Sequence, residues 1–495
     1  MKIKHTSIFT AGIALSLALF AGRLAGLFRE IELAKIFGIG ADADVAVLLL
    51  SIPDLFVNLL ISGGISAALV PRFLELNANK SAALFRQVSF MIAMIFIPIG
   101  ILVFILPDFV FRIFAPGISL PTSLTWVSIA SVAVAIPLTS FSGVLSAYLN
   151  SKNYYFIAGC GTLIFNLIII LFLQLHNYSS ELPMAHNKFW LLGLGISAGA
   201  MLRWLSLLMI LPRNQIYIHE SLVDKELIKS FFYAAFSASI LLLAPILIRA
   251  LASLTGEGAI AAFNYTQKLI ELPVGIFFAS IATVALTKMS QAFADNKFNH
   301  CLNVFNEQTQ NSLCFAIVIL IIGFWFAEPI VQIVYASGDF DKTAIHRISQ
   351  LFKIGLFSLP MISICMMATV YLNAGKNNLL LLKVSSFSLI ALPFFAAPGL
   401  LNNSETQLMY AVVAFHSLNA IALLFVMKQR IFGSHALISF KFIFHMVRSL
   451  IPVLFVIFLD LRLGVISIWV KVAFISIGFV FSSYLILGLY RGKLQ

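Results

Sequence analysis

The chain has 495 residues, of which 61% are hydrophobic and only 11% are charged, and its mean hydropathy is +1.01. Soluble globular proteins are about 45–50% apolar and about 25% charged, so this composition excludes a single water-soluble core. The net charge of +12 would suggest a nucleic-acid partner in a soluble protein, but here the basic residues lie mostly in short loops between apolar runs. We therefore predict an all-α polytopic membrane protein with no nucleic-acid partner.

About fourteen segments are long and apolar enough to cross a bilayer, which takes roughly 20 residues of helix. Lys2 and Lys4 precede the first apolar run, as in a secretory signal, but Arg23 and a further helical pattern follow where a cleavage site should stand. We therefore predict a retained first helix. The predicted spans are 7–28, 44–68, 88–107, 123–149, 155–175, 189–212, 229–252, 258–287, 311–335, 349–372, 379–400, 408–427, 443–461 and 464–489.

The distribution of basic residues and a weak internal repeat predict the organisation. Lys and Arg concentrate in alternate loops, which favours an even number of spans with both termini in the cytoplasm. The segment 68–87 resembles 284–308, since both leave an apolar helix, cross a basic loop and enter the next helix. Parallel repeats of this kind build many transporters, with the substrate site between the halves. We predict an N-terminal lobe at 1–222, a C-terminal lobe at 223–432 and an added helix pair at 433–495.

Charged residues inside the spans are the main functional candidates, because such a residue at mid-bilayer costs about 2.5–3.5 kcal/mol and usually faces a watery cavity or a partner. Cations slightly exceed carboxylates and lie in both halves, which favours a cavity that attracts an anion. Arginine is well suited to bidentate pairing with phosphate. The candidates are Arg23, Asp44, Asp54, Arg203, Lys268, Glu271 and Lys383, with Arg29 and Glu30 near the end of the first span.

The two arginines of the first span lie about 9 Å apart along the helix axis and about 120° apart around it. Arg23 and Arg29 could therefore line one wide cavity at two depths, or Arg29 could simply snorkel to the interface. Gly22 and Gly26 would let another helix come close.

Each of the other candidates has two interpretations. Lys268 and Glu271 share one helix face, either as a self-neutralising pair or as a cavity-facing cation held by a carboxylate. Pro273 and Gly275 follow and favour a kink or a loosened turn. Arg203 has no acid nearby in the sequence, so its partner would lie on another helix. Lys383 is interpreted as the loop end of its span.

Other kinds of chemistry have little support in the sequence. There is no GxxxxGK[ST] loop and no HExxH, so we predict neither an enzyme nor a bound cofactor or metal. Asp339 and Asp341 are predicted to lie in a turn with Gly338. Nine histidines are dispersed, and the four cysteines are interpreted as small apolar residues: Cys160, Cys301, Cys314 and Cys365.

Several motifs, in order along nearly the whole chain, carry a family resemblance. "GRLAGLFREIELAKIFGIGADADVAVLLLSIPDLFVNLLISGGISAALVP" (22–71) is the most specific, followed by "FAPGIS" (114–119), "GVLSAYLNSKNYY" (143–155), "NYTQKLIELPVGIF" (264–277) and "IVYASGDFD" (333–341). Together they resemble the MurJ/MviN family, the lipid II flippases of the MOP exporter superfamily.

The resemblance implies fourteen helices, with two six-helix lobes around a cationic cavity and a final helix pair forming a groove for a lipid tail. It implies a flippase of the bacterial inner membrane that moves an undecaprenyl-pyrophosphate-linked peptidoglycan precursor by alternating access, with membrane lipid and the cell-wall synthesis machinery as further partners. The family's cavity residues fall on Arg23, Arg29, Glu30, Asp44, Lys268 and Glu271. By this reasoning the diphosphate pairs with Arg23, Arg29 and Lys268.

The sequence also departs from the family pattern. Two family arginines fall on Val57 and Asn58, and a glutamate falls on Ser62. Lys268 keeps the charge but loses the bidentate fork. Arg203 stands where glutamine is expected, and we include it in the site as a replacement cation. Two interpretations stay open: a divergent lipid II flippase, or a flippase in the same fold for another polyprenyl-pyrophosphate-linked glycan of the O-antigen or capsule type.

Overall fold

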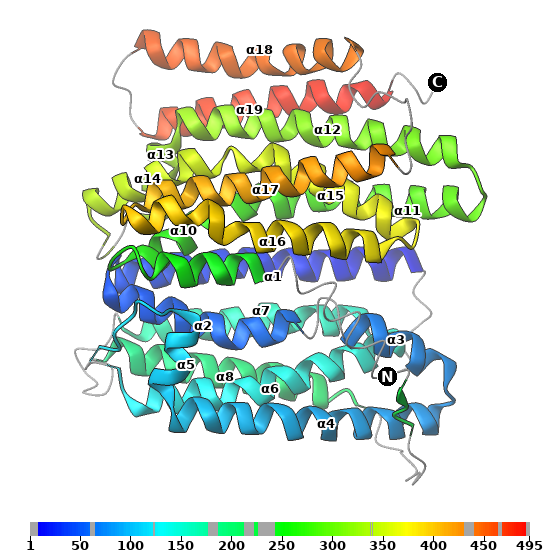
Figure 1. Ribbon diagram of the computed structural model, residues 1–495, viewed down its shortest axis with the longest axis vertical. Helices are drawn as coiled ribbons and strands as arrows, with labels where there is room; N and C mark the ends of the chain where they lie inside the picture. The colour runs from blue at the N-terminus through cyan, green and yellow to red at the C-terminus, as the bar shows by residue number, and fades with distance from the viewer. Residues whose placement is uncertain are drawn as a thin grey trace. The chain divides into compact units, whose positions relative to one another are not determined.

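Helices are the only regular elements in the part of the chain that the computed structural model describes (Figure 1). The described residues are 8–59, 65–121, 124–176, 187–211, 222–225, 243–336, 338, 340–429, 440–463 and 468–491. Within these ranges, nine helices are long and apolar enough to cross a membrane, and α14 with α15, which meet at a bend of 47°, would make a tenth. The predicted all-α polytopic fold class is confirmed.

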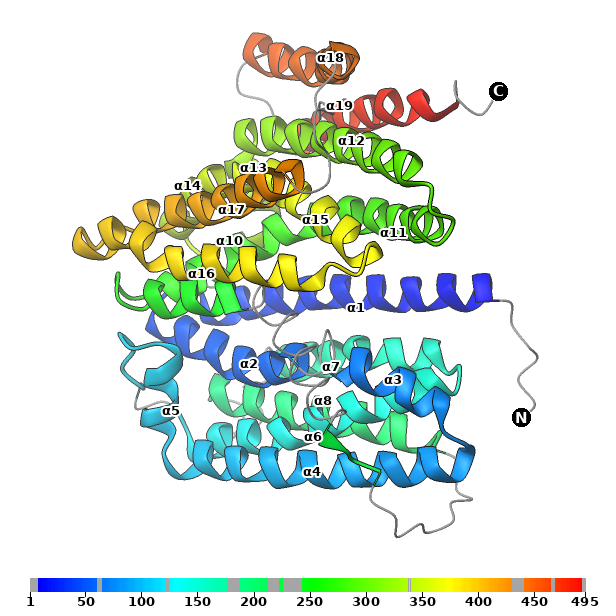
Figure 2. The same ribbon diagram turned by 45° about the vertical axis from the view of Figure 1, so that its right-hand side comes forward.

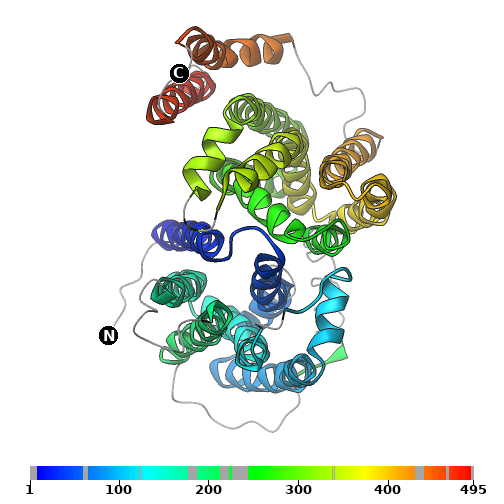
Figure 3. The same cartoon turned by 90° about the vertical axis from the view of Figure 1, so that its left-hand side faces the viewer.

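The helices group into two compact units, Met1–Ala261 with Ser337–Asp339, and Ala262–Ala336 with Phe340–Gln495. Figure 2 shows the helices of the first unit lying alongside one another, and Figure 3 views many of them end on. The predicted lobes at 1–222, 223–432 and 433–495 stay a prediction. The helix at Leu243–Ala252, which that prediction assigned to the second lobe, belongs to the first unit.

The first unit contains eight labelled helices and the short helix Leu243–Ala252. The first helix is longer than the predicted span 7–28, because Glu30, Glu32 and Lys35 continue it as a polar extension. It ends at Gly38, whose φ of +61° suits glycine and whose N–H donates to the Ala34 carbonyl at 2.8 Å. The helices are α1 (Ile8–Phe37), α2 (Ala41–Leu59), α3 (Ile65–Glu75), α4 (Ala78–Ile105), α5 (Pro107–Phe114), α6 (Trp126–Ser151), α7 (Tyr155–Gln174) and α8 (Lys188–Leu208).

The second unit contains the remaining helices, and α10 begins just before its boundary. The loosened turn predicted after Glu271 is confirmed as a π-helical turn, η4, which joins α10 to α11. The elements are α10 (Ala259–Pro273), η4 (Val274–Phe278), α11 (Ala279–Ala294), α12 (Phe298–Trp325), α13 (Ala327–Tyr335), α14 (Lys342–Gly355), α15 (Ser358–Ala374), α16 (Asn378–Leu401), α17 (Glu405–Met427), α18 (Phe440–Leu463) and α19 (Ile468–Arg491).

Side-chain caps start several helices where the sequence changes from polar to apolar. Asn77 accepts the N–H of Lys80 at the start of α4. Asp341 does the same for Ala344 at the start of α14, and this hydrogen bond, helped by Thr343, lowers the pKa of the Asp341 carboxyl. The turn predicted around Asp341 is therefore a helix cap. The two segments of the predicted repeat both fold as helix–turn–helix, α3–α4 and α11–α12.

The last helix pair is attached to the second unit by a polar contact that sequence reasoning missed. The Asp460 carboxylate on α18 accepts the indole N–H of Trp325 on α12 at 3.0 Å. Lys471 on α19 lies 3.5 Å from the same carboxylate. One acidic side chain thus joins α12, α18 and α19. The predicted lipid-tail groove of this pair stays a prediction.

Glycines set how closely the helices of the first unit pack. A Cβ on Gly22 would lie 3.4 Å from the backbone nitrogen of Leu163, and one on Gly26 would lie 3.3 Å from the Asn166 side chain. The close approach predicted for this glycine pair is therefore confirmed, with α7 as the neighbour. Gly100 is tighter still, since its Cβ would lie 2.4 Å from the Ala133 carbonyl oxygen on α6.

We expect the Gly100→Ala variant to lose about 1–3 kcal/mol of unfolding free energy, because the new methyl group must push the backbones of α4 and α6 apart. Thermal unfolding in detergent, followed by intrinsic fluorescence, measures the change. Gly40→Ala is the matched control, since nothing lies within 4 Å of its added Cβ. Equal unfolding midpoints for the two variants would show that α4 and α6 can move apart at Gly100 without a loss of stability.

Candidate functional site

The centre of the first unit holds two arginines and two carboxylates on three helices. Arg29 on α1 donates from Nη2 to Glu30 at 2.7 Å and from Nη1 to Asp54 on α2 at 3.3 Å. The Arg29 and Glu30 side chains are only 6% and 2% exposed, whereas that of Asp54 is 35% exposed. The positive charge of Arg29 is therefore paired with one deeply buried carboxylate, Glu30, and one partly exposed carboxylate, Asp54.

Asn166 on α7 fixes the position of Arg29. Its side-chain oxygen accepts from Arg29 Nη1 at 3.0 Å, and its amide nitrogen donates to the Gly22 carbonyl at 3.1 Å. Both bonds are possible because Gly22 and Gly26 carry no side chain on the face that meets α7. The glycine pair predicted from sequence thus positions the arginine that lies one to two turns further along α1.

Arg203 on α8 is the second buried arginine. It is 4% exposed and lies across Gly161 of α7, where an added Cβ would be 3.1 Å from its Nε. Asp54 on α2 attracts it electrostatically, without forming an ion pair or a hydrogen bond with it. Among the described residues, neither Arg203 Nε nor Arg29 Nε has a hydrogen-bond partner. We name Arg29, Glu30, Asp54, Asn166 and Arg203 the buried charge cluster; its formal charges balance.

Arg23 lies outside the buried charge cluster and is exposed on the first unit. Arg29 faces the interior of the unit and Arg23 faces its surface, as expected for two residues about 120° apart around the helix. Simple snorkelling of Arg29 is excluded, since its guanidinium is paired inside the unit.

Asp44 holds a segment of backbone in place, and its predicted role toward the substrate stays a prediction. Its carboxylate is 4% exposed and accepts the N–H groups of Gly258 and Ala261, each at 2.7 Å. These groups belong to the first turn of α10, whose backbone donors have no partner within the helix. Asp44 is thus a helix cap supplied from α2, and the structure does not bring it to the buried charge cluster.

Lys268 and Glu271 form the predicted pair on one face of α10. Lys268 Nζ lies 3.0 Å from Glu271 Oε2, and both side chains are partly exposed. The pair stands immediately before the π-helical turn of the second unit. Lys383 is exposed in the second turn of α16, near the predicted end of its span. Ser62 and the side chains of Val57 and Asn58 lie outside the described residues.

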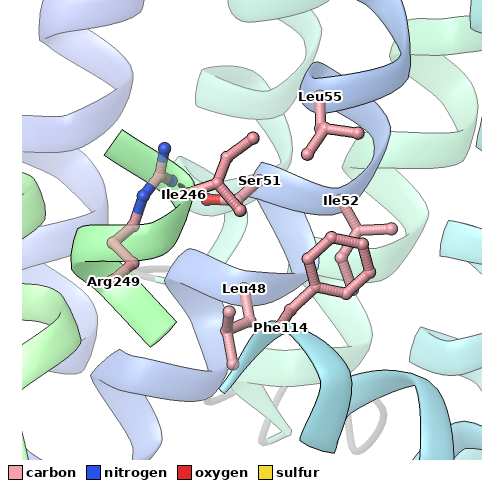
Figure 4. Close-up of a pocket in the computed structure, with 7 residues that line it drawn as sticks. All are labelled: Leu48, Ser51, Ile52, Leu55, Phe114, Ile246 and Arg249. Carbon is pink, nitrogen blue, oxygen red and sulfur yellow. Dashed lines mark hydrogen bonds between the residues drawn. The ribbon is translucent and has the colours of Figure 1, made fainter. Parts of the chain in front are cut away.

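A hollow in the first unit shows a cation that sequence reasoning missed (Figure 4). Arg249, on the helix Leu243–Ala252, donates to the Ser51 hydroxyl on α2 and to the Pro245 carbonyl. The sequence analysis singled out neither Arg249 nor Ser51, because the pair depends on how two helices pack. The hollow is otherwise apolar, lined by Leu48, Ile52, Leu55, Phe114 and Ile246.

The described residues contain no group of three or more His, Cys, Asp or Glu that could hold a metal ion. The four cysteines are all free thiols that are buried or partly buried. The chemistry offered by the candidate site is therefore charge pairing: guanidinium groups, an ammonium group and carboxylates that can exchange partners with an anionic ligand.

A helical bundle that crosses the membrane many times and keeps opposite charges paired in its interior is the architecture of a membrane transporter. The family model for "Lipid II flippase MurJ" matches residues 33–487. The chain therefore belongs to the MurJ family of lipid II flippases, as the motifs suggested.

Relatives and solved structures agree with this assignment. A probable lipid II flippase MurJ of Buchnera aphidicola subsp. Schizaphis graminum is 22% identical over 73% of this chain and 72% of its own length. One of Aquifex aeolicus is 23% identical, over 77% and 75%. The structure "Lipid II flippase MurJ, inward closed conformation" is similar in fold, with a TM-score of 0.84 and 20% identity over 98% of this chain and 100% of that one.

A solved structure from another transporter family has a similar fold. An inward-facing multidrug resistance MATE family transporter of the MOP superfamily has a TM-score of 0.67 and 12% identity, over 87% of this chain and 96% of that one. The chain therefore shares its fold with a transporter of the MOP superfamily, as expected from the resemblance.

Proposed function

We propose that this protein moves lipid II, the polyprenyl-diphosphate-linked precursor of peptidoglycan, from the inner to the outer leaflet of the bacterial inner membrane by alternating access. The observation that carries the proposal is the family match over residues 33–487. The arginines in the spans of the first unit support it, because a guanidinium pairs well with the oxygens of a diphosphate.

The proposed roles follow from exposure and pairing. Arg23 is exposed and offers the diphosphate a first contact. Arg29 and Arg203 are buried cations that the diphosphate would pair with next. Glu30 and Asp54 pair with Arg29, and Asp54 also attracts Arg203 electrostatically. Lys268 offers the cation of the second unit, with Glu271 holding it between substrates. Asp44 contributes indirectly, by fixing the first turn of α10.

The proposed setting is the cytoplasmic membrane, with both termini in the cytoplasm, and the cell-wall synthesis machinery would supply and consume the lipid. The transmembrane potential acts on each translocated charge with about 2.3 kcal/mol per 100 mV, so it can assist the passage of an anionic head group outward. The proposal needs no bound cofactor.

A second candidate function is transport of another polyprenyl-diphosphate-linked glycan, of the O-antigen or capsule type. The observation that favours it is the loss of two family arginines, at Val57 and Asn58, together with the presence of Arg203 and Asp54 in one buried charge cluster. A changed set of cations indicates a changed head group.

Complementation separates the two. We expect this chain, expressed in a bacterium depleted of its own lipid II flippase, to restore growth and normal cell shape. Membrane levels are matched by immunoblot, and a strain lacking its O-antigen flippase is tested in parallel. Rescue of the O-antigen strain without rescue of the depleted strain would replace the first function by the second.

A further inference from the structure

Asp54 differs from every other charged member of the buried charge cluster in its accessibility. Its side chain is 35% exposed, while Arg29 and Glu30 are 6% and 2% exposed and Arg203 is 4% exposed. Asp54 is therefore the charged side chain of this cluster that is most accessible from outside the unit.

Asp54 is also the weaker of the two carboxylate partners of Arg29. Its oxygen lies 3.3 Å from Nη1, compared with 2.7 Å between Nη2 and Glu30. Charge-assisted hydrogen bonds between N–H and a carboxylate are usually about 2.7–2.9 Å long. The Glu30 bond is thus fully formed, whereas the Asp54 bond is stretched and shared with the Coulombic attraction of Arg203.

The arginines have donor capacity that the carboxylates leave unused. Arg29 Nε and Arg203 Nε are both buried and have no hydrogen-bond partner among the described residues. A buried polar N–H without a partner is destabilising, so such groups usually mark a strained or functional position. A diphosphate has more acceptor oxygens than one carboxylate and could engage donors that Asp54 does not reach.

From these three observations we propose that Asp54 is a built-in competitor for the substrate's diphosphate. In the empty protein its carboxylate pairs with Arg29; the arriving diphosphate displaces it; and its return expels the diphosphate once the protein opens outward. The inference rests on the proposed function, since it concerns the same polyprenyl-diphosphate substrate. It assigns to Asp54 the role of setting affinity and release, rather than that of binding.

The decisive variant is Asp54→Asn, which keeps the size and removes the charge. We expect the purified full-length variant in detergent to bind inorganic pyrophosphate about tenfold more tightly than the wild type, measured by isothermal titration calorimetry. We also expect cells that depend on it to grow more slowly, because release is impaired. Tighter binding with slower transport is a result that mere loss of structure cannot produce.

Asp42→Asn is the matched control. Asp42 lies on the same helix, is also 35% exposed, and pairs with Lys188 at 3.4 Å away from the buried charge cluster. It should leave pyrophosphate binding unchanged. Asp54→Glu restores the carboxylate and should return the affinity to the wild-type value. Equal or weaker binding by Asp54→Asn would overturn the inference.

A measurement on the wild type covers the case in which Asp54→Asn fails to fold. Modification of Asp54 by a hydrophobic carbodiimide, followed by peptide mass spectrometry, should increase when pyrophosphate is added, while buried Glu30 stays unmodified. Unchanged or reduced labelling of Asp54 would contradict displacement. If the wild type binds no pyrophosphate, or binds it equally well after Arg23→Gln and Arg29→Gln, it is the proposed binding site itself that fails.

Discussion

Arg29→Gln is expected to abolish transport and to lower the free energy of unfolding by about 3–5 kcal/mol. The substitution leaves Glu30 buried without its cation, and it leaves Asp54 with Arg203 alone. Removing one partner of a buried ion pair is strongly destabilising for this reason. Growth of the flippase-depleted strain measures transport, and thermal unfolding in detergent measures stability.

The Arg23→Gln variant is expected to lose transport without losing stability. Arg23 is exposed, so its loss should leave the unfolding midpoint near that of the wild type while growth fails. Arg112→Gln, at an exposed position of α5, should change neither. An Arg29→Gln variant as stable as Arg23→Gln would mean that the buried charge cluster contributes nothing to the fold.

Asp44→Ala is expected to destabilise the first unit by about 2–5 kcal/mol. The change leaves two buried backbone donors, the N–H groups of Gly258 and Ala261, without their acceptor. Each unpaired donor costs roughly 1–3 kcal/mol of unfolding free energy. Hydrogen exchange of the peptide that contains 258–261, read by mass spectrometry, should speed up markedly in the variant, and the unfolding midpoint should fall.

The control for Asp44 lies two residues earlier. Asp42→Ala removes a partly exposed carboxylate from the same first turn of α2, where the pair with Lys188 contributes little. It should change neither the exchange at 258–261 nor the midpoint appreciably. If Asp44→Ala behaved like Asp42→Ala, the cap of α10 would be dispensable, and a direct role of Asp44 toward substrate would regain support.

Local patterns in the sequence predicted local structure well. The apolar runs placed the membrane helices, because about 20 apolar residues in a row have few other stable environments. Lys268 and Glu271 were expected to pair because residues three apart share a helix face, and they do. Pro273 and Gly275 predicted the loosened turn correctly, because a proline and a glycine disturb the helix within a few residues of their own positions.

The long-range partners could not be predicted from the sequence. Nothing near Arg29 in the sequence indicates Asn166, and nothing near Asp44 indicates the start of α10, because both contacts depend on how the helices pack. The rule that intramembrane charge lines a cavity stays a prediction for the exposed Arg23. For Asp44 it overlooked the other common use of a buried carboxylate, which is to satisfy backbone donors.

The pairing of Arg29 with its immediate neighbour bears on the order of synthesis. A helix made early must enter the bilayer before its later partners exist, and α2, α7 and α8 all follow α1 along the chain. Arg29 carries its own counter-ion, Glu30, into the membrane, so α1 is electrically neutral at this depth from the start. Asp54, Asn166 and Arg203 can then join one at a time, and no step of assembly leaves Arg29 without a carboxylate beside it.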